Sequence, residues 1–161
     1  MYKGCFMDLT EHGLYIEKDD YFDEFVSPGW MWNKTESRPH YLALSDASGL
    51  MWMIPLSSKV DHYKEKIARI EKQRGLGNCL YYHIGVIAGK ERAFIISGVF
   101  PVTSDYISHP YTINHIPYVV ADEQLIRKLN SKMRRYLRLL EQGVMRDANH
   151  VLCIREKLLQ K

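Results

Sequence analysis

The sequence predicts an α+β protein, built as a small antiparallel β-barrel or curved sheet with about three to four helices. Two pairs of short apolar runs, each pair joined by turn-forming residues, indicate antiparallel hairpins. Three segments with helical spacing of apolar residues indicate the helices. The 161 residues, 46% of them hydrophobic and 25% charged, have the size and composition of one folded domain. No repeat or linker divides them, so we expect a single domain over residues 1–161.

The first strand is expected over residues 2–9, a short apolar run. His40 to Ser45 and Leu50 to Leu56 are strand-like runs separated by Asp46-Ala47-Ser48-Gly49, a turn-forming tetrapeptide. This spacing predicts an antiparallel hairpin.

A second hairpin is expected over Cys79 to Ala88 and Arg92 to Val102, which are rich in Tyr, Ile, Val and Phe. Gly89-Lys90-Glu91 lies between the two runs and is expected to form the turn. Short strands joined in this way favour a small barrel or curved antiparallel sheet over a parallel α/β sheet.

Two of the expected helices are modest in length. Asp61 is expected to cap a helix that runs to about Arg74 and ends at Gly75, and its apolar face carries Tyr63, Ile67 and Ile70. The last helix is expected over about residues 148–160, with Val151, Ile154 and Leu158 in helical register.

The strongest helical pattern covers Asp122 to Gln142 and is expected to stop at Gly143. Its apolar stripe consists of Leu125, Ile126, Leu129, Met133, Tyr136, Leu137 and Leu140. Its opposite face is basic and carries Arg127, Lys128, Lys132, Arg134, Arg135 and Arg138.

Charge is distributed unevenly along the chain, whose net charge is +3. Residues 1–40 carry four basic and eight acidic side chains, a balance of −4. The balance is +2 over residues 41–121 and +5 over residues 122–161, where ten basic side chains face five acidic ones. Such asymmetry is typical of an anionic partner at the basic end, and a solvated helix surface is the alternative.

The lengths of the apolar runs and the spacing of the cysteines indicate the cellular compartment in which the protein is expected. No run approaches the ~18 apolar residues of a membrane span, and the N-terminal apolar run is too short for a signal peptide. Cys5, Cys79 and Cys153 are odd in number and far apart, which argues against disulfides and against a cysteine-based zinc site. We expect a cytoplasmic protein.

Most catalytic signatures are absent from the sequence, which has no Walker-type phosphate loop and no GxGxxG, GxSxG or HExxH pattern. Asp19-Asp20 and Asp23-Glu24 lie in an acidic stretch that we interpret as a solvated loop rather than a metal site. His109 and His115 have ligand-like spacing, and we interpret them as loop positions. We therefore expect no metal and no cofactor.

The strand–turn–strand unit brings chemically useful residues together at one end. Antiparallel pairing across residues 46–49 places Arg38 beside Ser57, Ser58 and Lys59. A guanidinium, two hydroxyls and an ammonium suit an anionic phosphate. The alternative is an ordinary loop in which the two serines form turn hydrogen bonds with the backbone.

The sequence resembles the Kid/MazF-like ribonuclease toxins, whose fold is a small SH3-like barrel with helices. The resemblance lies in the order Arg38-Pro39, a strand, a turn, a strand and then Pro55-Leu56-Ser57-Ser58. The fuller resemblance is to the ToxN/AbiQ group of type III toxin–antitoxin endoribonucleases, particularly the CptN-like or TenpN-like branch. In that group a Pro-Leu-Thr/Ser-Ser segment at a strand end is followed closely by lysine and a helix, as in residues 55–63 here. The resemblance is specific over about residues 38–64.

Carried over to this sequence, the family pattern points to Ser57, Ser58 and Lys59 as the catalytic segment. The ToxN pattern has a proline between the second hydroxyl residue and the lysine, whereas here Lys59 follows Ser58 directly. His62 or Lys64 can therefore take part of the role of Lys59.

The resemblance implies metal-independent cleavage of single-stranded RNA. The ribose 2′-OH attacks the adjacent phosphorus and leaves a 2′,3′-cyclic phosphate and a 5′-OH, which requires a proton acceptor, a proton donor and fixed positive charge. The implied partner is a small repeated RNA antitoxin, folded as a pseudoknot, in a closed hetero-oligomer of several protein and RNA units. Cellular or phage RNA is the implied substrate, and neither DNA nor a membrane is expected.

RNA-binding side chains are expected around this centre. Two polar-aromatic segments can stack and clamp bases, with core packing as the alternative for each aromatic ring. The expected set is Trp30, Trp32 and Lys34 in one segment, Tyr111, Asn114 and His115 in the other, Arg38 from the Kid/MazF pattern, and Lys132, Arg134, Arg135 and Arg138 on the basic helix.

Two other functions remain open from the residues alone. One is a non-catalytic RNA-binding module that uses the same basic helix and aromatic segments. The other is an SH3-like protein-interaction domain in which the basic helix is structural.

Overall fold

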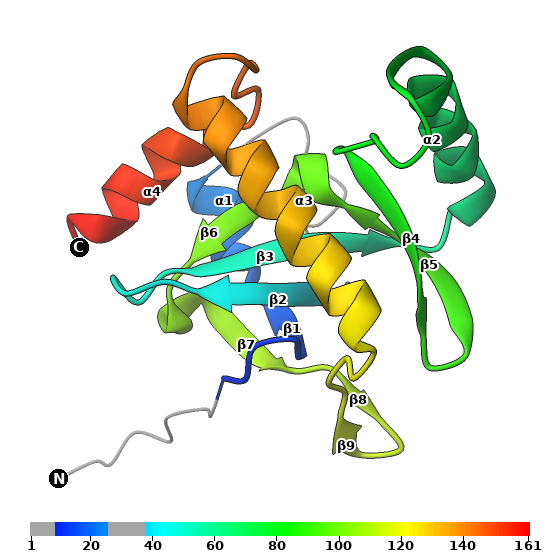
Figure 1. Cartoon of the computed structure of the whole chain (residues 1–161). Coiled ribbons are helices and arrows are strands. Elements are labelled where there is room, and N and C mark those ends of the chain that lie inside the picture. The colour runs from blue at the N-terminus through cyan, green and yellow to red at the C-terminus, as the bar shows by residue number, and fades with distance from the viewer. Residues whose placement is uncertain (1–8, 26–37) are drawn as a thin grey trace, which may run out of the picture.

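A computed structural model describes residues 9–25 and 38–161, which form an α+β fold (Figure 1). The main sheet contains β1 (Leu14–Glu17), β2 (His40–Ser45), β3 (Met51–Ser57), β4 (Tyr82–Ile87), β5 (Lys90–Ile95), β6 (Phe100–Val102) and β7 (Ile107–Pro110). The helices are α1 (Asp19–Glu24), α2 (Val60–Arg74), α3 (Glu123–Glu141) and α4 (Val151–Leu159). Two 3-10 turns, η2 (Ile96–Gly98) and η3 (Ser104–Tyr106), and a small hairpin of β8 (Thr112–Ile113) and β9 (Ile116–Pro117) complete it.

The seven strands of the main sheet pair in the order β4-β5-β3-β2-β1-β7, and β6 pairs with β3. All of these pairings are antiparallel. The expected antiparallel sheet with about three to four helices is therefore present. The expected barrel is not formed by the described strands, because the sheet ends at β4 on one side and at β7 on the other.

The first hairpin forms as the sequence predicts. Its two strands pair from His40↔Pro55 to Ser45↔Met51, with one irregularity between Leu42 and Leu44. The Asp46 carboxylate holds the turn, since its Oδ1 accepts from the backbone N–H of Ser48 at 2.9 Å and of Leu50 at 3.2 Å. These local bonds fix the register that brings the two outer ends of the hairpin together.

The second hairpin differs from the prediction. Its turn is Ala88-Gly89, both with positive φ (52° and 79°), and Lys90 already pairs with Ile87 as the first residue of β5. The apolar run that follows is not one strand, because η2 interrupts it. β5 pairs with the last residues of β3 and β6 with the first, so the two strands follow one edge of β3 in succession.

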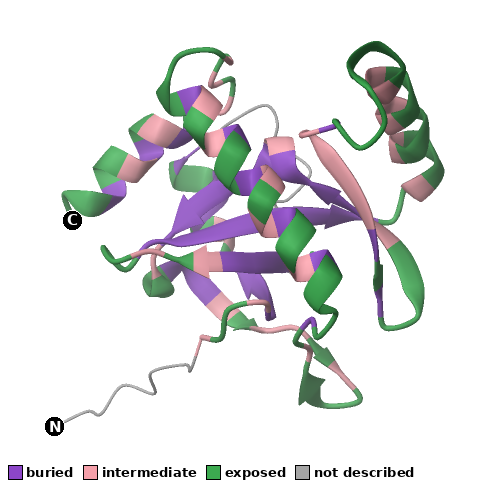
Figure 2. Cartoon of the chain, viewed as in Figure 1, coloured by how far each residue is buried: buried purple, intermediate pink, exposed green. Residues whose placement is uncertain are grey.

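Helix α3 agrees closely with its predicted bounds, and it lies across one face of the sheet (Figures 1 and 2). Asp122 is its N-cap and accepts from the backbone N–H of Gln124 and Leu125 at 3.0 and 3.2 Å. A close approach to β4 positions the helix, since a Cβ on Gly85 would lie 2.6 Å from Leu125 Cδ1. The residues buried beneath the helix are Leu125, Leu129, Met133, Tyr136 and Leu140.

The starts of two other helices differ from the predictions. α2 begins at Val60 with Lys59 as its N-cap residue, so Asp61 lies in the first turn and does not cap it. α4 begins at Val151 rather than near residue 148, because the Asp147 carboxylate accepts from the backbone N–H of Val151 and of Leu152, both at 2.9 Å.

The predicted acidic loop is wrong. Residues 19–24 form α1, whose acidic side chains lie around a buried pair, Tyr21 and Phe22. The Tyr21 hydroxyl donates to the carbonyl of Pro101 at 2.7 Å and so fastens α1 to β6. The strand expected over residues 2–9 lies almost wholly outside the described residues, and Leu9 is not in a strand.

One buried polar contact joins two strands of the sheet. Glu17 of β1 and His40 of β2 are 2% and 1% exposed, and the His40 imidazole contacts the Glu17 carboxylate through Nδ1. The rings of Phe22 and Phe100 lie against His40, so the pair is enclosed by apolar groups. Removing one partner would leave the other polar side chain buried without it, which makes this contact a constraint on how β1 and β2 pack.

The cap of α3 gives the first prediction. Asp122→Ala should lower the free energy of unfolding by about 1 kcal/mol, because two N–H groups of the first turn lose their acceptor. Asp122→Asn should retain most of that stability, since asparagine caps about as well as aspartate. Urea unfolding followed by circular dichroism measures both variants. Equal stability of Asp122→Ala and the wild type would contradict the role of this cap.

Candidate active site

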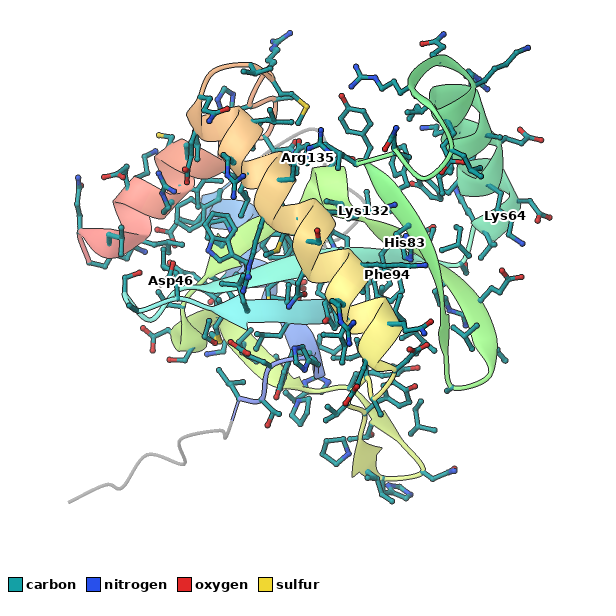
Figure 3. The ribbon with its side chains drawn as sticks, in the orientation of Figure 1. Asp46, Lys64, His83, Phe94, Lys132 and Arg135 are labelled. Atoms are coloured by element: carbon teal, nitrogen blue, oxygen red, sulfur yellow. The ribbon has the colours of Figure 1, made fainter. Side chains whose placement is uncertain are left out.

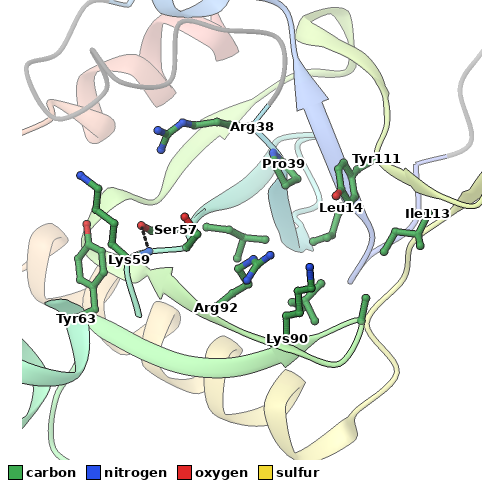
Figure 4. Close-up of a pocket in the computed structure, with 14 residues that line it drawn as sticks. Leu14, Arg38, Pro39, Ser57, Lys59, Tyr63, Lys90, Arg92, Tyr111 and Ile113 are labelled. Carbon is green, nitrogen blue, oxygen red and sulfur yellow. Dashed lines mark hydrogen bonds between the residues drawn. The ribbon is translucent and has the colours of Figure 1, made fainter. Parts of the chain in front are cut away.

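A pocket of about 740 Å³ opens where β3 ends and α2 begins (Figure 4). Its walls come from the strands β3, β4 and β5 and from residues before β2 and around β7 and β8. The side chains that line it are Leu14, Arg38, Pro39, Leu56, Ser57, Ser58, Lys59, Tyr63, Ile87, Ala88, Lys90, Arg92, Tyr111 and Ile113.

The predicted segment Ser57, Ser58 and Lys59 lines this pocket. Ser57 is 9% exposed at the last position of β3, whereas Ser58 and Lys59 are exposed. Ser57 Oγ accepts from the backbone N–H of Lys59 at 3.2 Å. The alternative interpretation of a serine turn therefore applies to Ser57. The same bond fixes the hydroxyl at the pocket wall and leaves its hydrogen available to donate to a ligand.

Arg38 reaches the same pocket from the other strand of the first hairpin, as the register predicts. In Figure 4 its guanidinium points toward Ser57 and Lys59. Tyr63, one turn into α2, faces them. Burial raises the pKa of the Tyr63 hydroxyl, and the positive charge of Arg38 opposes that rise. The phenol is therefore protonated at neutral pH and can donate a hydrogen bond.

Strand β5 supplies two further cations, Lys90 and Arg92. Pairing of Ser57 with Ala93 places β5 directly beside the end of β3. Arg92 Nη1 donates to the carbonyl of Glu91 at 2.9 Å, which restricts where its guanidinium points. Four cations thus line the pocket, and none of the described lining residues is acidic. Such a site favours an anion that accepts several hydrogen bonds.

The remaining wall of the pocket is apolar and aromatic. Tyr111 and Ile113 lie across from Lys90 in Figure 4, on the segment that leads into β8. This segment is held against the second hairpin, because the Tyr118 hydroxyl accepts from the backbone N–H of Ala88 at 3.0 Å. The loop that the sequence predicts is wrong for His109, which lies in β7, and for residues 112–113, which form β8, whereas His115 lies in a turn as expected.

Several predicted site residues lie elsewhere. Lys64 forms an ion pair with Glu91, Nζ to Oε2 3.1 Å, and His62 packs edge-on against the Tyr63 ring on the exposed side of α2. Neither residue lines the pocket. Asn114 and His115 form the exposed turn of the β8–β9 hairpin and do not line it either. Trp30, Trp32 and Lys34 lie outside the described residues.

The predicted RNA-binding residues of α3 do not line this pocket. Arg134, Arg135 and Arg138 are exposed and line a groove on one side of α3, and Lys132 lines a second groove on the other side together with Arg135. Positive charge is therefore present in two places, around the pocket and on the solvent face of α3.

Lys132 is held by an unusual partner, His83 of β4. Their side chains point toward each other in Figure 3, and Nζ lies 3.2 Å from His83 Nδ1. Burial, together with the charges of Lys132 and Lys128, lowers the pKa of His83 to about 4. At neutral pH the imidazole is therefore uncharged and can accept from the ammonium.

Metal-ligating side chains do not gather in the described part of the chain: no three His, Cys, Asp or Glu residues lie where they could share an ion. Within residues 9–25 and 38–161, no helix is both long enough and apolar enough to cross a membrane.

Sequence reasoning missed Lys90, Arg92 and the pocket-facing position of Tyr63. Lys90 reads as a turn residue and Arg92 as the start of an ordinary strand, and Tyr63 reads as part of an apolar helix face. Lys90 and Arg92 are placed by the pairing of β5 with the end of β3, which joins residues 36 positions apart at Ser57↔Ala93. No local pattern encodes that pairing.

We compared the sequence with known protein families and with curated proteins. No family model matches the sequence, and no curated protein is detectably similar to it.

The His83–Lys132 contact gives the second prediction. Histidine NMR titration should show His83 with a pKa of about 4. Because the unfolded state binds this proton near pH 6.5 and the folded state does not, stability should fall as pH drops from about 6.5 to 4. His83→Gln should flatten that part of the stability–pH curve, whereas both proteins carry no charge at position 83 at pH 8. Titration of His83 near 6.5 would contradict the contact.

Proposed function

We propose that this protein is a metal-independent endoribonuclease that cleaves single-stranded RNA in the pocket at the end of β3. The observation that carries the proposal is the set of lining groups: a hydroxyl and an ammonium from the Ser57–Lys59 segment, with Arg38, Lys90 and Arg92 around them. A phosphodiester in this pocket would meet positive charge from three separate segments of the chain.

The proposed reaction is an internal transesterification. The ribose 2′-oxygen bonds to the adjacent phosphorus and loses its proton, while the bond from phosphorus to the 5′-oxygen breaks and that oxygen gains a proton. The products are a 2′,3′-cyclic phosphate and a 5′-OH. Negative charge builds on the non-bridging oxygens in the transition state, where fixed cations stabilise it most. Arg38, Lys90 and Arg92 supply charge that a divalent ion provides in metal-dependent nucleases.

Proton transfer is assigned to groups next to Ser57. Lys59 is exposed at the rim, and its neutral amine would accept the proton of the 2′-OH, while the Tyr63 hydroxyl would give its proton to the leaving 5′-oxygen. Ser57 orients the phosphate through its free hydroxyl hydrogen, since Oγ already accepts from Lys59 N. The ion pair of Lys64 with Glu91 makes Lys64 a weaker alternative to Lys59.

The biological setting is proposed from the resemblance to the ToxN/AbiQ group. The protein would be the toxin of a type III toxin–antitoxin system, acting in the cytoplasm on cellular or phage RNA. A small repeated RNA, folded as a pseudoknot, would be its antitoxin, its substrate and its product, in a closed assembly of several protein and RNA units. The uncompensated charge on α3 supports an RNA partner.

The second candidate function is a non-catalytic RNA-binding module. It is favoured by the hydrogen bond from the backbone N–H of Lys59 to Ser57 Oγ, because this turn bond gives Ser57 a structural role that requires no catalysis. Both functions require RNA binding, and only the first requires strand cleavage.

Removing Lys59 tests the catalytic proposal. Lys59→Ala should lower the cleavage rate of single-stranded RNA by roughly 10²–10⁴-fold, the usual contribution of a positioned acid or base. Lys72→Ala is the matched control, since Lys72 is an exposed lysine on α2 that does not line the pocket. A folded Lys59→Ala protein that cleaves at the wild-type rate would show that another group performs this role.

Product analysis in excess EDTA tests the mechanism. Cleavage should persist with chelator present and should leave 2′,3′-cyclic phosphate and 5′-OH ends, because the pocket cations take the place of a metal ion. Activity that disappears in EDTA and returns with Mg²⁺ or Mn²⁺ would contradict the proposal. Intact RNA that shifts on a gel under both conditions would favour the binding module.

A further inference from the structure

Two grooves flank helix α3 on its solvent side. One, of about 840 Å³, lies between α3 and the residues around His12 and Val120. The other, of about 630 Å³, lies between α3 and the loop that contains Gly77 and Asn78. They share Arg127, Ser131 and Arg135, so α3 forms a ridge between them.

The cations of α3 form two rows along the helix, and Arg127 of the first row and Arg135 of the second line both grooves. Arg127, Arg134 and Arg138 form the first row, and Lys128, Lys132 and Arg135 form the second. With a rise of about 1.5 Å per residue, the first row extends over about 16 Å. At 3.6 residues per turn, the two rows are centred about 100° apart around the helix axis, so they lie less than a helix diameter apart on the same solvent face. Ser131 and Gln124, both polar and exposed, lie between them.

These charges are not neutralised within the described part of the chain. Some cations elsewhere pair with carboxylates, as in Arg155–Glu141 at 2.8 Å and Lys161–Glu24 at 2.6 Å. None of the six α3 cations forms an ion pair with a described residue, although Glu123 lines the first groove and Glu71 lies within electrostatic reach of Lys132. Six like charges on one face require an anionic partner or remain solvated at a cost in repulsion.

The double row indicates what kind of anion fits. A single strand of RNA presents one line of phosphates and would occupy one groove. A duplex presents two lines of phosphates with 2′-hydroxyls between them across its wide, shallow minor groove. The ridge of α3 matches this pattern, with cations toward each groove and hydrogen-bonding side chains along the middle.

A membrane surface fits less well. A helix that binds a membrane buries its apolar face in the lipid. The apolar face of α3 is occupied instead by the protein core, where Leu129 and Met133 are fully buried. No apolar side chain lies between the two rows.

We infer that the solvent face of α3 binds double-stranded RNA across its two grooves, at a site separate from the cleavage pocket. The inference rests on the proposed function for the choice of RNA as ligand. None of the α3 residues lines the pocket. Base-paired RNA can therefore be held on α3 while a single-stranded segment occupies the pocket.

The test is a binding measurement on the full chain carrying Lys59→Ala, with a blunt 12-base-pair RNA duplex and with each of its single strands. Fluorescence anisotropy at several salt concentrations should show the duplex binding at least tenfold more tightly than either strand. Arg134→Ala with Arg138→Ala, which line only the first groove, and separately Lys128→Ala with Lys132→Ala, which line only the second, should each weaken duplex binding. Each pair should reduce the steepness of the log–log salt dependence by about two.

Lys72→Ala with Lys157→Ala is the control, since both lysines are exposed and line neither groove. Circular dichroism of every variant verifies folding. Equal affinity for duplex and single strand, dependence on one row only, or stronger binding to phosphatidylglycerol vesicles would overturn the inference. Duplex binding by a wild-type protein that cleaves no single-stranded RNA would leave the inference standing and refute the proposed nuclease activity.

Discussion

Strand β3 pairs on both of its edges, and this pairing determines where the pocket and its cations lie. His40↔Pro55 on one edge brings Arg38 to the end of the strand, and Ser57↔Ala93 on the other brings Arg92. The interior of β3 is fully buried, as Met53 and Ile54 show, so its register cannot slip without exposing the core. The cations around the pocket repel one another, and this rigid frame holds them together before any ligand arrives.

Patterns that are local in sequence account for the parts of the fold that could be predicted. The Asp46–Gly49 turn and the heavily amphipathic helix α3 were both evident, because neighbouring residues determine them. α1 was not evident, since its acidic residues conceal two core aromatics, Tyr21 and Phe22. The apolar run after Arg92 reads as one strand, yet η2 divides it so that both halves pair with β3.

Local sequence patterns also account for some residues of the candidate site and not for others. The register of one hairpin was enough to predict that Arg38 and Ser57 share a pocket, and both line it. Lys64 is five residues from Lys59 in sequence, yet its ion pair turns it to Glu91. Lys90 and Arg92 come from a strand whose partner is fixed by tertiary packing. Two of the four cations that line the pocket, Lys90 and Arg92, could therefore not be predicted from local sequence.

NMR of the protein with an uncleavable dinucleotide measures whether the β3 pocket binds a phosphodiester. Adding 2′-O-methyl ApA should shift the backbone signals of Ser57 and Lys59 together with the guanidinium signals of Arg38 and Arg92, because these groups line one pocket. Shifts confined to α3, with the signals of the pocket residues unchanged, would contradict binding in the pocket.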